Sequence, residues 1–335
     1  MKRFLIPLMF SAIATQLCHS AEPYHLLKEI PVGGDGGWDY LTVDSASQRL
    51  YVSHGTQVVV IDTSKDTVIG EITNTPGVHG IALAPDLKRG LVTCGRENKG
   101  ALVDLTTLTI TSKVETGANP DGMLYEPSQK EFYTFNGRGN SATVIAAQTG
   151  TVTATIPLGG KPEFPQTDTS LGRVFDNLED KSEVVAIDIK QHAVVNRWPV
   201  APGEEPSGSA YDAKTHHLFL GCGNQMMVMM DAASGKVLDH IAIGDGVDAN
   251  AFDPGLQYAF ASCGDGTTTI AKEEGDKLTL VQTLKTEKGA RTMTLDPATH
   301  KIYLASAKFD APAEGQRHGK LVAGSFKVLV YGLAK

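Results

Sequence analysis

The chain has few cysteines, no surplus of positive charge and no long hydrophobic run beyond its first twenty residues. Three of its four cysteines lie after residue 20, and this odd, widely spaced set does not suit a disulfide framework. Its 30 Lys and Arg residues are outnumbered by 38 Asp and Glu residues, so the basic face that nucleic-acid binding requires is not expected. No later stretch approaches the roughly 18 apolar residues of a transmembrane helix, and none is predicted.

Familiar catalytic and cofactor-binding motifs are also absent. The chain contains no GxSxG elbow, no Walker A loop, no CxxCH haem motif and no HExxH zinc motif. The glycine-rich GGDGGWD segment precedes a predicted strand, whereas a phosphate-binding loop of this kind opens a helix. We therefore predict no cofactor and no metal site, although metal ligands from separate repeats could converge in space.

Residues 1–20 have the pattern of a secretory signal peptide. Lys2 and Arg3 form a basic start, Phe4–Leu17 is an interrupted apolar run, and small residues follow near position 20. This pattern predicts export to the periplasm or to the outside of the cell. The remaining residues, 21–335, are expected to form one domain, because a large all-β domain can reach this length.

One short pattern recurs along the whole of this domain. Each copy has a small loop followed by an alternating apolar run, as in GGWDYLTVD in the first copy and VHGIALAP in the second. The copies begin 40 to 44 residues apart. Their first residues are Trp38, Val78, Pro120, Pro162, Pro206, Val247 and Ala290. This period indicates a repeat fold with seven units.

Each unit contains four short segments with the alternation of β-strands. In the first unit they are Tyr40–Val43, Arg49–Ser53, Val58–Asp62 and Thr67–Ile72. Turn-forming residues separate them, and no window keeps a helical period over three turns. Four strands in about forty residues are typical of one blade of a β-propeller.

The last unit is one strand short, and the start of the domain supplies a strand. The last unit has candidates at Thr292–Leu295, Lys301–Ala305 and Phe326–Tyr331, and then the sequence ends. Tyr24–Gly33 resembles the fourth strand of a unit that lacks its first three. Pairing the two ends would remove an open sheet edge. We predict an all-β, seven-bladed propeller with four antiparallel strands per blade, closed by the N-terminal strand completing the last blade.

The second predicted strand of each unit ends in a related tetrapeptide. The seven versions are YVSH (51–54), LVTC (91–94), YTFN (133–136), VFDN (174–177), FLGC (219–222), FASC (260–263) and YLAS (303–306). This series resembles the YVTN β-propeller repeat family, which includes the YncE-like exported proteins. The resemblance covers the chain beyond residue 20 and implies a fold of the WD40-like superfamily. It implies no particular activity, since such repeats occur in binding proteins and in enzyme subunits.

Cys94, Cys222 and Cys263 occupy the last position of three of these tetrapeptides. A small buried residue suits the end of the second strand, so packing between blades is the simplest role for all three. A redox or metal role for Cys222 and Cys263, which fall on adjacent blades, is the alternative that the sequence leaves open.

Two rings of residues are expected on one face of the propeller. The loop leading into the innermost strand and the loop joining the second and third strands share this face, around the central channel, and such loops often carry function. The position after each repeat start gives Asp39, His79, Asp121, Glu163, Ser207, Asp248 and Arg291. Two positions past each tetrapeptide lie Thr56, Arg96, Arg138, Glu179, Asn224, Asp265 and Lys308.

We predict that a ligand binds at this rim. The candidate binding residues are Trp38, Asp39, His54, His79, Arg96, Asp121, Arg138, Glu163, Glu205, Ser207, Asp248, Asp265 and Arg291. Crowded carboxylates suit an amine, a hydroxyl or a cation, and guanidinium groups suit an acidic group. The alternative is that these charges neutralise one another and cap strand ends. Trp38 could likewise stack on a ligand or pack between blades.

Two further segments have specific expectations. The loop from Ala307 to Ser325 takes nineteen residues where its counterparts take about four. It is either a flexible cover over the rim or a disordered surface loop. The Thr215–His217 turn falls on the opposite face and is expected to be exposed polar surface.

These observations predict an exported, monomeric propeller that binds a small molecule or a protein partner at the rim and does not catalyse a reaction. One alternative is an enzyme of hydrolase or lyase type, with a rim carboxylate or His79 as the general base and Arg291 holding an anionic group. Another is the propeller subunit of a quinoprotein or other redox assembly whose redox group sits on a different chain. The sequence identifies neither the ligand nor a reaction.

Overall fold

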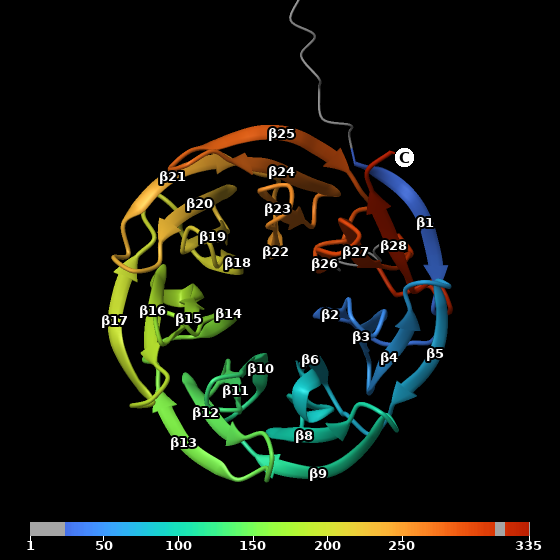
Figure 1. Ribbon diagram of the computed structural model, residues 1–335. Coiled ribbons are helices and arrows are strands. Elements are labelled where there is room, and N and C mark those ends of the chain that lie inside the picture. Colours follow the sequence, from blue (N-terminus) through green and yellow to red (C-terminus); the bar gives the residue numbers. More distant parts are fainter. Residues whose placement is uncertain (1–23, 312–318, 335) are drawn as a thin grey trace, which may run out of the picture.

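The computed structural model describes residues 24–311 and 319–334. Within these ranges the chain forms seven four-stranded antiparallel sheets, which stand in a ring around a central axis (Figure 1). The helices in the described ranges are two three-residue 3-10 segments, η1 (Pro85–Leu87) and η2 (Glu179–Lys181), and neither has the length or apolarity to cross a membrane. The predicted seven-bladed propeller is confirmed, and the predicted signal peptide lies outside the described residues.

Each blade runs from an innermost strand at the central channel to an outermost strand at the circumference (Figure 1). The first three blades are β2 (Leu41–Asp44), β3 (Arg49–His54), β4 (Gln57–Asp62) and β5 (Thr67–Ile72); β6 (Val78–Ala84), β7 (Arg89–Cys94), β8 (Lys99–Asp104) and β9 (Thr109–Glu115); and β10 (Pro120–Glu126), β11 (Glu131–Asn136), β12 (Ser141–Ala146) and β13 (Val152–Pro157). The next three are β14 (Pro162–Asp168), β15 (Arg173–Leu178), β16 (Glu183–Asp188) and β17 (Ala193–Pro199); β18 (Pro206–Asp212), β19 (His217–Cys222), β20 (Met226–Asp231) and β21 (Val237–Ala242); and β22 (Val247–Asp253), β23 (Tyr258–Cys263), β24 (Thr267–Glu273) and β25 (Leu278–Lys285). The seventh contains β26 (Met293–Asp296), β27 (Lys301–Ser306) and β28 (Lys327–Gly332).

The fourth strand of the seventh blade is β1 (His25–Pro31), from the opposite end of the chain. It pairs antiparallel with β28, with Ile30 opposite Val328, and the two ends of the colour scale meet there in Figure 1. Tyr24, just before β1, is buried, and its hydroxyl donates a hydrogen bond to the carbonyl of His300 at 2.7 Å. The predicted closure of the ring by the N-terminal strand is thus confirmed.

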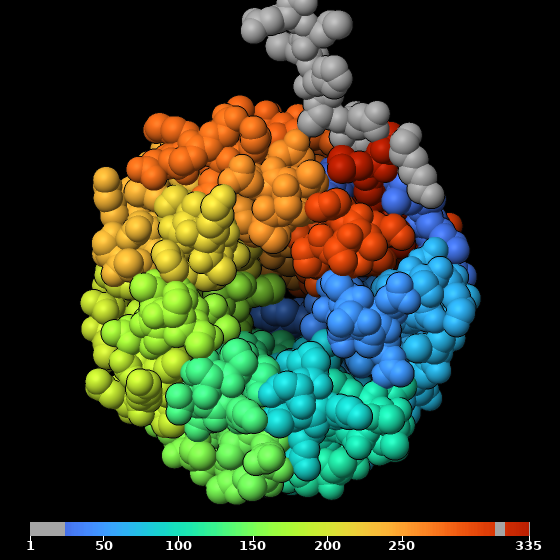
Figure 2. Space-filling view, in the orientation of Figure 1, coloured from blue at the N-terminus to red at the C-terminus, as the bar shows by residue number. Residues whose placement is uncertain are grey.

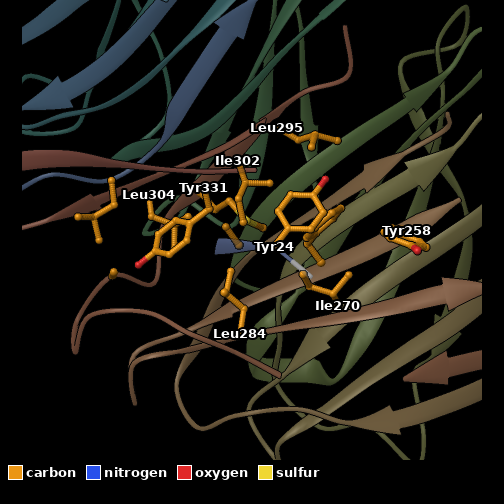
Figure 3. Close-up of a cluster of buried hydrophobic side chains, with 13 residues drawn as sticks. Tyr24, Tyr258, Ile270, Leu284, Leu295, Ile302, Leu304 and Tyr331 are labelled. Carbon is orange, nitrogen blue, oxygen red and sulfur yellow. The ribbon is translucent and has the colours of Figure 1, made fainter. Parts of the chain in front are cut away.

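The hydrophobic core lies between neighbouring blades. Alternate residues of each strand face the blade before it or the blade after it, which is why runs such as Val58–Ile61 are apolar on both faces and fully buried. Figure 3 shows one such cluster between the sixth and seventh blades, where Tyr24 joins Ile270 and Ile302. The N-terminal segment is therefore fixed by packing as well as by its strand pairing.

The three cysteines of the described chain are free and buried between blades. Burial raises the pKa of each thiol, Cys94, Cys222 and Cys263, to about 12. A buried thiol that keeps its proton behaves as a small apolar side chain, which supports the packing role over the redox one.

Loops on the two faces of the ring differ in kind. We call the face with the loops into the inner strands, and between second and third strands, the mouth rim, and the opposite face the far rim. The far rim carries carboxylate–histidine pairs that join neighbouring blades. The pairs, with nitrogen–oxygen distances of 2.6 to 2.8 Å, are His192–Glu131, His216–Asp168, His217–Glu273 and His300–Asp253. The expectation that the Thr215–His217 turn is exposed polar surface is wrong at His217, which is 7% exposed and holds Glu273.

Candidate functional site

Figure 2 shows the hollow at the centre of the ring as seen from the far rim. At the other end of the channel, where the inner strands begin, lies a cavity of about 260 Å³. We call it the channel-mouth pocket. Its lining residues are Asp39, Tyr40, Asp121, Lys161, Glu163, Phe164, Glu179, Ser207, Asp248, Ala249, Arg291, Thr292 and Met293. Six of the seven residues of the first predicted ring are among them, and the seventh, His79, contacts two of those six.

The strand geometry explains why this ring converges. In five blades the inner strand begins with a buried residue, such as Val78 or Val247, and the next side chain alternates to the opposite direction. A register shift follows directly in each of these strands, for example between Val78 and Ile81. Such bulges bend a strand and re-aim a side chain, so the second residue points toward the axis rather than into a blade interface.

His79 lies between two carboxylates. Its Nδ1 is 2.7 Å from Oδ2 of Asp39 and 3.1 Å from Oδ1 of Asp121. Burial alone would lower the pKa of His79, but the hydrogen bonds to Asp121 and Asp39 raise it to about 10. Burial raises the pKa of Asp39 by more than its bond to His79 lowers it. His79 is therefore an imidazolium held by two acidic groups.

The same three residues could also hold a cation. Asp39, His79 and Asp121 each offer a ligand atom, and these atoms lie within 4.8 Å of one another. A divalent metal would have to displace the proton of His79, because a ligating imidazole nitrogen is unprotonated. The sequence did not predict this cluster, since its members come from three different blades.

Glu163 and Asp248 lie deeper among the other acidic groups. Burial raises the pKa of Glu163 to about 8, although Lys161 lies 2.5 Å away and acts in the opposite direction. Burial likewise raises the pKa of Asp248, despite Arg291, whose Nε is 3.1 Å from its Oδ2. Each of these carboxyl groups therefore has one basic partner, whose effect on its pKa is outweighed by burial.

Asp176 adds an acidic group beneath this pocket. It is 1% exposed, and neither of its carboxyl oxygens makes a hydrogen bond with the residues described. Burial, followed by the charges of Glu163 and Asp121, raises its pKa well above the ordinary value, and only the backbone of Glu163 acts in the opposite direction. Asp176 is the third residue of its tetrapeptide. In the first blade the equivalent residue is Ser53, whose hydroxyl accepts a hydrogen bond from the backbone N–H of Asp39. Asp176 is the only ionisable residue at that position in the seven repeats. The sequence could have identified it as unusual by this difference.

Two aromatic rings from opposite sides of the ring narrow the channel. Tyr40 and Phe164 have centroids 5.0 Å apart, and the Tyr40 hydroxyl donates to the carbonyl of Glu163 at 3.0 Å. Phe164 and Met293 line both the channel-mouth pocket and a separate cavity toward the far rim. The channel-mouth pocket therefore has an apolar floor.

Seven of the thirteen candidate residues do not line the channel-mouth pocket: His79 contacts two of its lining residues, Trp38 lines a second cavity described below, and the other five lie elsewhere. Arg96, Arg138, Glu205 and Asp265 are exposed, and His54 is 3% exposed and stacks on Phe326, with ring centroids 4.2 Å apart. The exposed residues sit on loops whose direction varies from blade to blade. Asp265, for example, caps its own turn by accepting a hydrogen bond from the backbone of Thr267 at 3.0 Å. Conversely, Lys161, Glu179 and Tyr40 line the pocket and were not among the candidates.

A larger cavity of about 1000 Å³ lies beside the first and shares Arg291 and Thr292 with it. We call it the outer pocket. Trp38 lines it, with its ring centroid 5.1 Å from Phe326 and 6.1 Å from Phe309. Trp38 thus packs against a buried neighbour and also borders a pocket, so both expected roles are compatible.

The long loop of the last blade supplies one wall of the outer pocket. Its two sides pair with each other: Asp310 donates its backbone N–H to Lys320 at 2.8 Å, and Val322 donates to Lys308 at 2.9 Å. Residues 312–318 of this loop lie outside the described ranges. The described part of the loop is therefore a short antiparallel extension of the mouth rim.

Comparison with known proteins identifies the fold but no family. No family model and no curated protein matches the chain. A chain of the Kuenenia stuttgartiensis hydrazine synthase structure is 18% identical, with a TM-score of 0.70, over 82% of this chain and 94% of that one. A chain of the mitotic checkpoint complex is 11% identical, with a TM-score of 0.78, over 100% and 99%. The U3-55K structure is 9% identical, with a TM-score of 0.74, over 92% and 98%. Likeness at such low identity shows the fold alone.

Proposed function

We propose that this propeller binds a small molecule carrying a protonated amine in the channel-mouth pocket, and that it does so without catalysis. The observation that carries the proposal is the composition of the lining. Five carboxylates, from Asp39, Asp121, Glu163, Glu179 and Asp248, face a closed-ended cavity that contains two basic side chains, from Lys161 and Arg291.

The electrostatics of the channel-mouth pocket support a cationic ligand. The pKa values of Asp39, Glu163 and Asp248 are raised, with burial as the largest cause in each case. Each of these groups would gain from a nearby positive charge, which an ammonium group supplies together with hydrogen-bond donors. A cavity of about 260 Å³ suits a small ligand rather than a protein segment.

The state of His79 does not favour it as the general base of the enzymatic alternative, for which a rim carboxylate remains the other candidate. With a pKa raised to about 10, His79 carries its proton at neutral pH and has no free lone pair to act as a general base. No contact among the described residues supports the alternative of a redox-assembly subunit. The likeness to a hydrazine synthase chain concerns the fold alone. We also propose that the protein is exported and belongs to the YVTN repeat family. Only the sequence supports these two parts of the proposal.

The test is calorimetric titration with a series of primary amines and the matched alcohols at pH 8. We expect amines to bind and alcohols of the same size not to bind. Asp121→Asn should weaken amine binding about tenfold or more, because it removes a charged partner. Asp62→Asn, on the far rim, is the matched control and should leave the affinity unchanged. Equal binding of amines and alcohols, or no binding of either, would overturn the proposal.

A further inference from the structure

We infer that the ligand is an α-amino acid with an aromatic side chain, bound across the channel-mouth pocket and the outer pocket together. This inference rests on the proposed function and names the ligand class of the same site. Three adjacent environments point to this class of ligand: the acidic channel-mouth pocket, the guanidinium group of Arg291 at its edge, and an aromatic surface in the outer pocket.

Arg291 stands at the junction of the two pockets. Together with Thr292 it lines both of them. Its Nε lies 3.1 Å from Oδ2 of Asp248, and its side chain is 59% exposed. The guanidinium group therefore keeps donors available for a ligand, and its planar fork matches a carboxylate.

The outer pocket has the opposite charge balance to the channel-mouth pocket. Its basic residues are Lys288, Arg291 and Lys308, and its acidic residues are Glu287 and Asp310. Lys327 already neutralises Glu287, at 2.7 Å. An anionic group on the ligand is therefore favoured on this side of the junction and disfavoured among the carboxylates of the channel-mouth pocket.

Exposed aromatic surface lies next to that positive charge. Phe309 is 49% exposed, and its ring centroid is 6.1 Å from that of Trp38. Among the described residues, the other exposed large hydrophobic side chains all lie on the outermost strands β1, β5, β13, β17 and β25. Phe309 instead borders the outer pocket, where an aromatic ligand ring could pack against it and Trp38.

The order of these groups matches one class of molecule. In an aromatic α-amino acid, the ammonium and the carboxylate are attached to the same carbon, and the ring follows one carbon further on. With the ammonium among Asp39, Asp121 and Asp248, the carboxylate can reach Arg291. The ring then enters the outer pocket, whose volume of about 1000 Å³ accommodates it.

The experiment uses four probes that differ by one group. L-Phenylalanine has all three groups, 2-phenylethylamine lacks the carboxylate, 3-phenylpropionate lacks the amine, and L-alanine lacks the ring. Trp38 reports binding by fluorescence in the Trp198→Phe background, because the chain has only two tryptophans. Trp198 lies on β17 at the circumference. Calorimetry on the unmodified protein checks the same affinities.

We expect phenylalanine to bind about tenfold more tightly than each of the other three probes. Arg291→Gln should remove the advantage of phenylalanine over phenylethylamine. Phe309→Ala should weaken phenylalanine and phenylethylamine about three- to tenfold and leave alanine unchanged. Leu280→Ala, an exposed apolar residue on β25, is the matched control and should change nothing.

The outcomes separate this inference from the proposed function. If amines bind but phenylalanine is no tighter than alanine or phenylethylamine, the inference fails and the amine site stands. If Arg291→Gln leaves phenylalanine binding unchanged, the placement of the carboxylate is wrong and the inference fails. If no amine binds, the proposed function fails and the inference fails with it.

Discussion

The two rims of this propeller are both acidic, but the aspartates of the far-rim turns and the carboxylates of the channel-mouth pocket are in opposite electrostatic situations. On the far rim, backbone N–H groups of the turns lower the pKa values of Asp104 and Asp188. On the mouth rim, burial raises the pKa values of Glu163 and Asp248. The difference lies in burial and in the supply of partners, since these far-rim aspartates accept hydrogen bonds from their own turns, whereas the carboxylates of the channel-mouth pocket lie close to one another and outnumber the basic groups beside them.

This contrast separates structural from functional charge. The far-rim carboxylates end strands, close turns and, through histidines such as His216 and His300, join one blade to the next. The carboxylates that line the channel-mouth pocket also have partners, which are His79 for Asp39 and Asp121, Lys161 for Glu163 and Arg291 for Asp248, but they outnumber these basic groups. Groups with perturbed pKa values in a cavity are typical of binding and catalytic sites, which is why the proposals above concern the mouth rim.

The largest expected effect comes from removing a far-rim carboxylate. Asp168 accepts hydrogen bonds from Ser170 at 2.7 Å and from the backbone of Leu171 at 3.1 Å, and Tyr211 donates to it as well. Asp168→Ala leaves these donors without a partner and should lower the free energy of unfolding by about 3 kcal/mol. Urea denaturation at pH 7 measures this change.

The matched mouth-rim change is Asp121→Ala. Its carboxylate lies among other acidic groups and has one basic partner, His79, which would keep its contact with Asp39, so we expect the free energy of unfolding to change by less than about 1 kcal/mol. If Asp121→Ala proved as destabilising as Asp168→Ala, the distinction between the two rims would be lost.

The second expected effect is a gain in stability from neutralising Asp176. Its folded-state pKa is raised, so this group contributes stability that is present below its unfolded pKa of about 4 and is lost as the pH rises through the folded value. Asp176→Asn should therefore stabilise the protein by about 1 to 2 kcal/mol at pH 8.5, with a smaller effect at pH 5. Urea denaturation at both pH values provides the measurement. Destabilisation at both would show that Asp176 has a stabilising partner.

The repeat pattern predicted the fold well because every blade carries the same information. Seven copies of one alternating pattern established the sheets, and the incomplete last copy indicated the closure by β1. The same regularity predicted the inner ring, because the residue after each repeat start lies at or beside the channel-mouth pocket in all seven blades, and in five of them it is the second residue of the inner strand. Asp121 and its equivalents in the other blades therefore reach the axis as expected.

The positions of the other candidate residues and the pairs between blades could not be predicted, because they depend on contacts that the repeat period does not encode. Arg138 lies on a turn, where side-chain direction varies from blade to blade, and it is exposed rather than near the axis. His217 pairs with Glu273, which is 56 residues away in the sequence and on the next blade. Recognising such a pair requires the register of one blade against its neighbour, and that register follows from the packing of the folded ring.

The smallest expected effect is a pH dependence of amine affinity that comes from the mouth rim alone. The pKa of Glu163 is raised to about 8, so this group gains its charge as the pH rises from 6 to 9. The far-rim carboxylates with lowered pKa values are already ionised throughout this range. A primary amine of pKa about 10.4 stays protonated over most of it, so its affinity should rise about threefold between pH 6.5 and pH 8.5, a change of about 0.7 kcal/mol. In Glu163→Gln the part of this rise that comes from Glu163 should disappear and the part from Asp39, whose pKa is raised to about 7, should remain, whereas Glu97→Gln, outside the pocket lining, should retain the whole rise. An affinity that is constant over this range, or that falls, would mean that the mouth-rim carboxylates are already ionised at pH 6.5 and that the two rims do not differ in the way described.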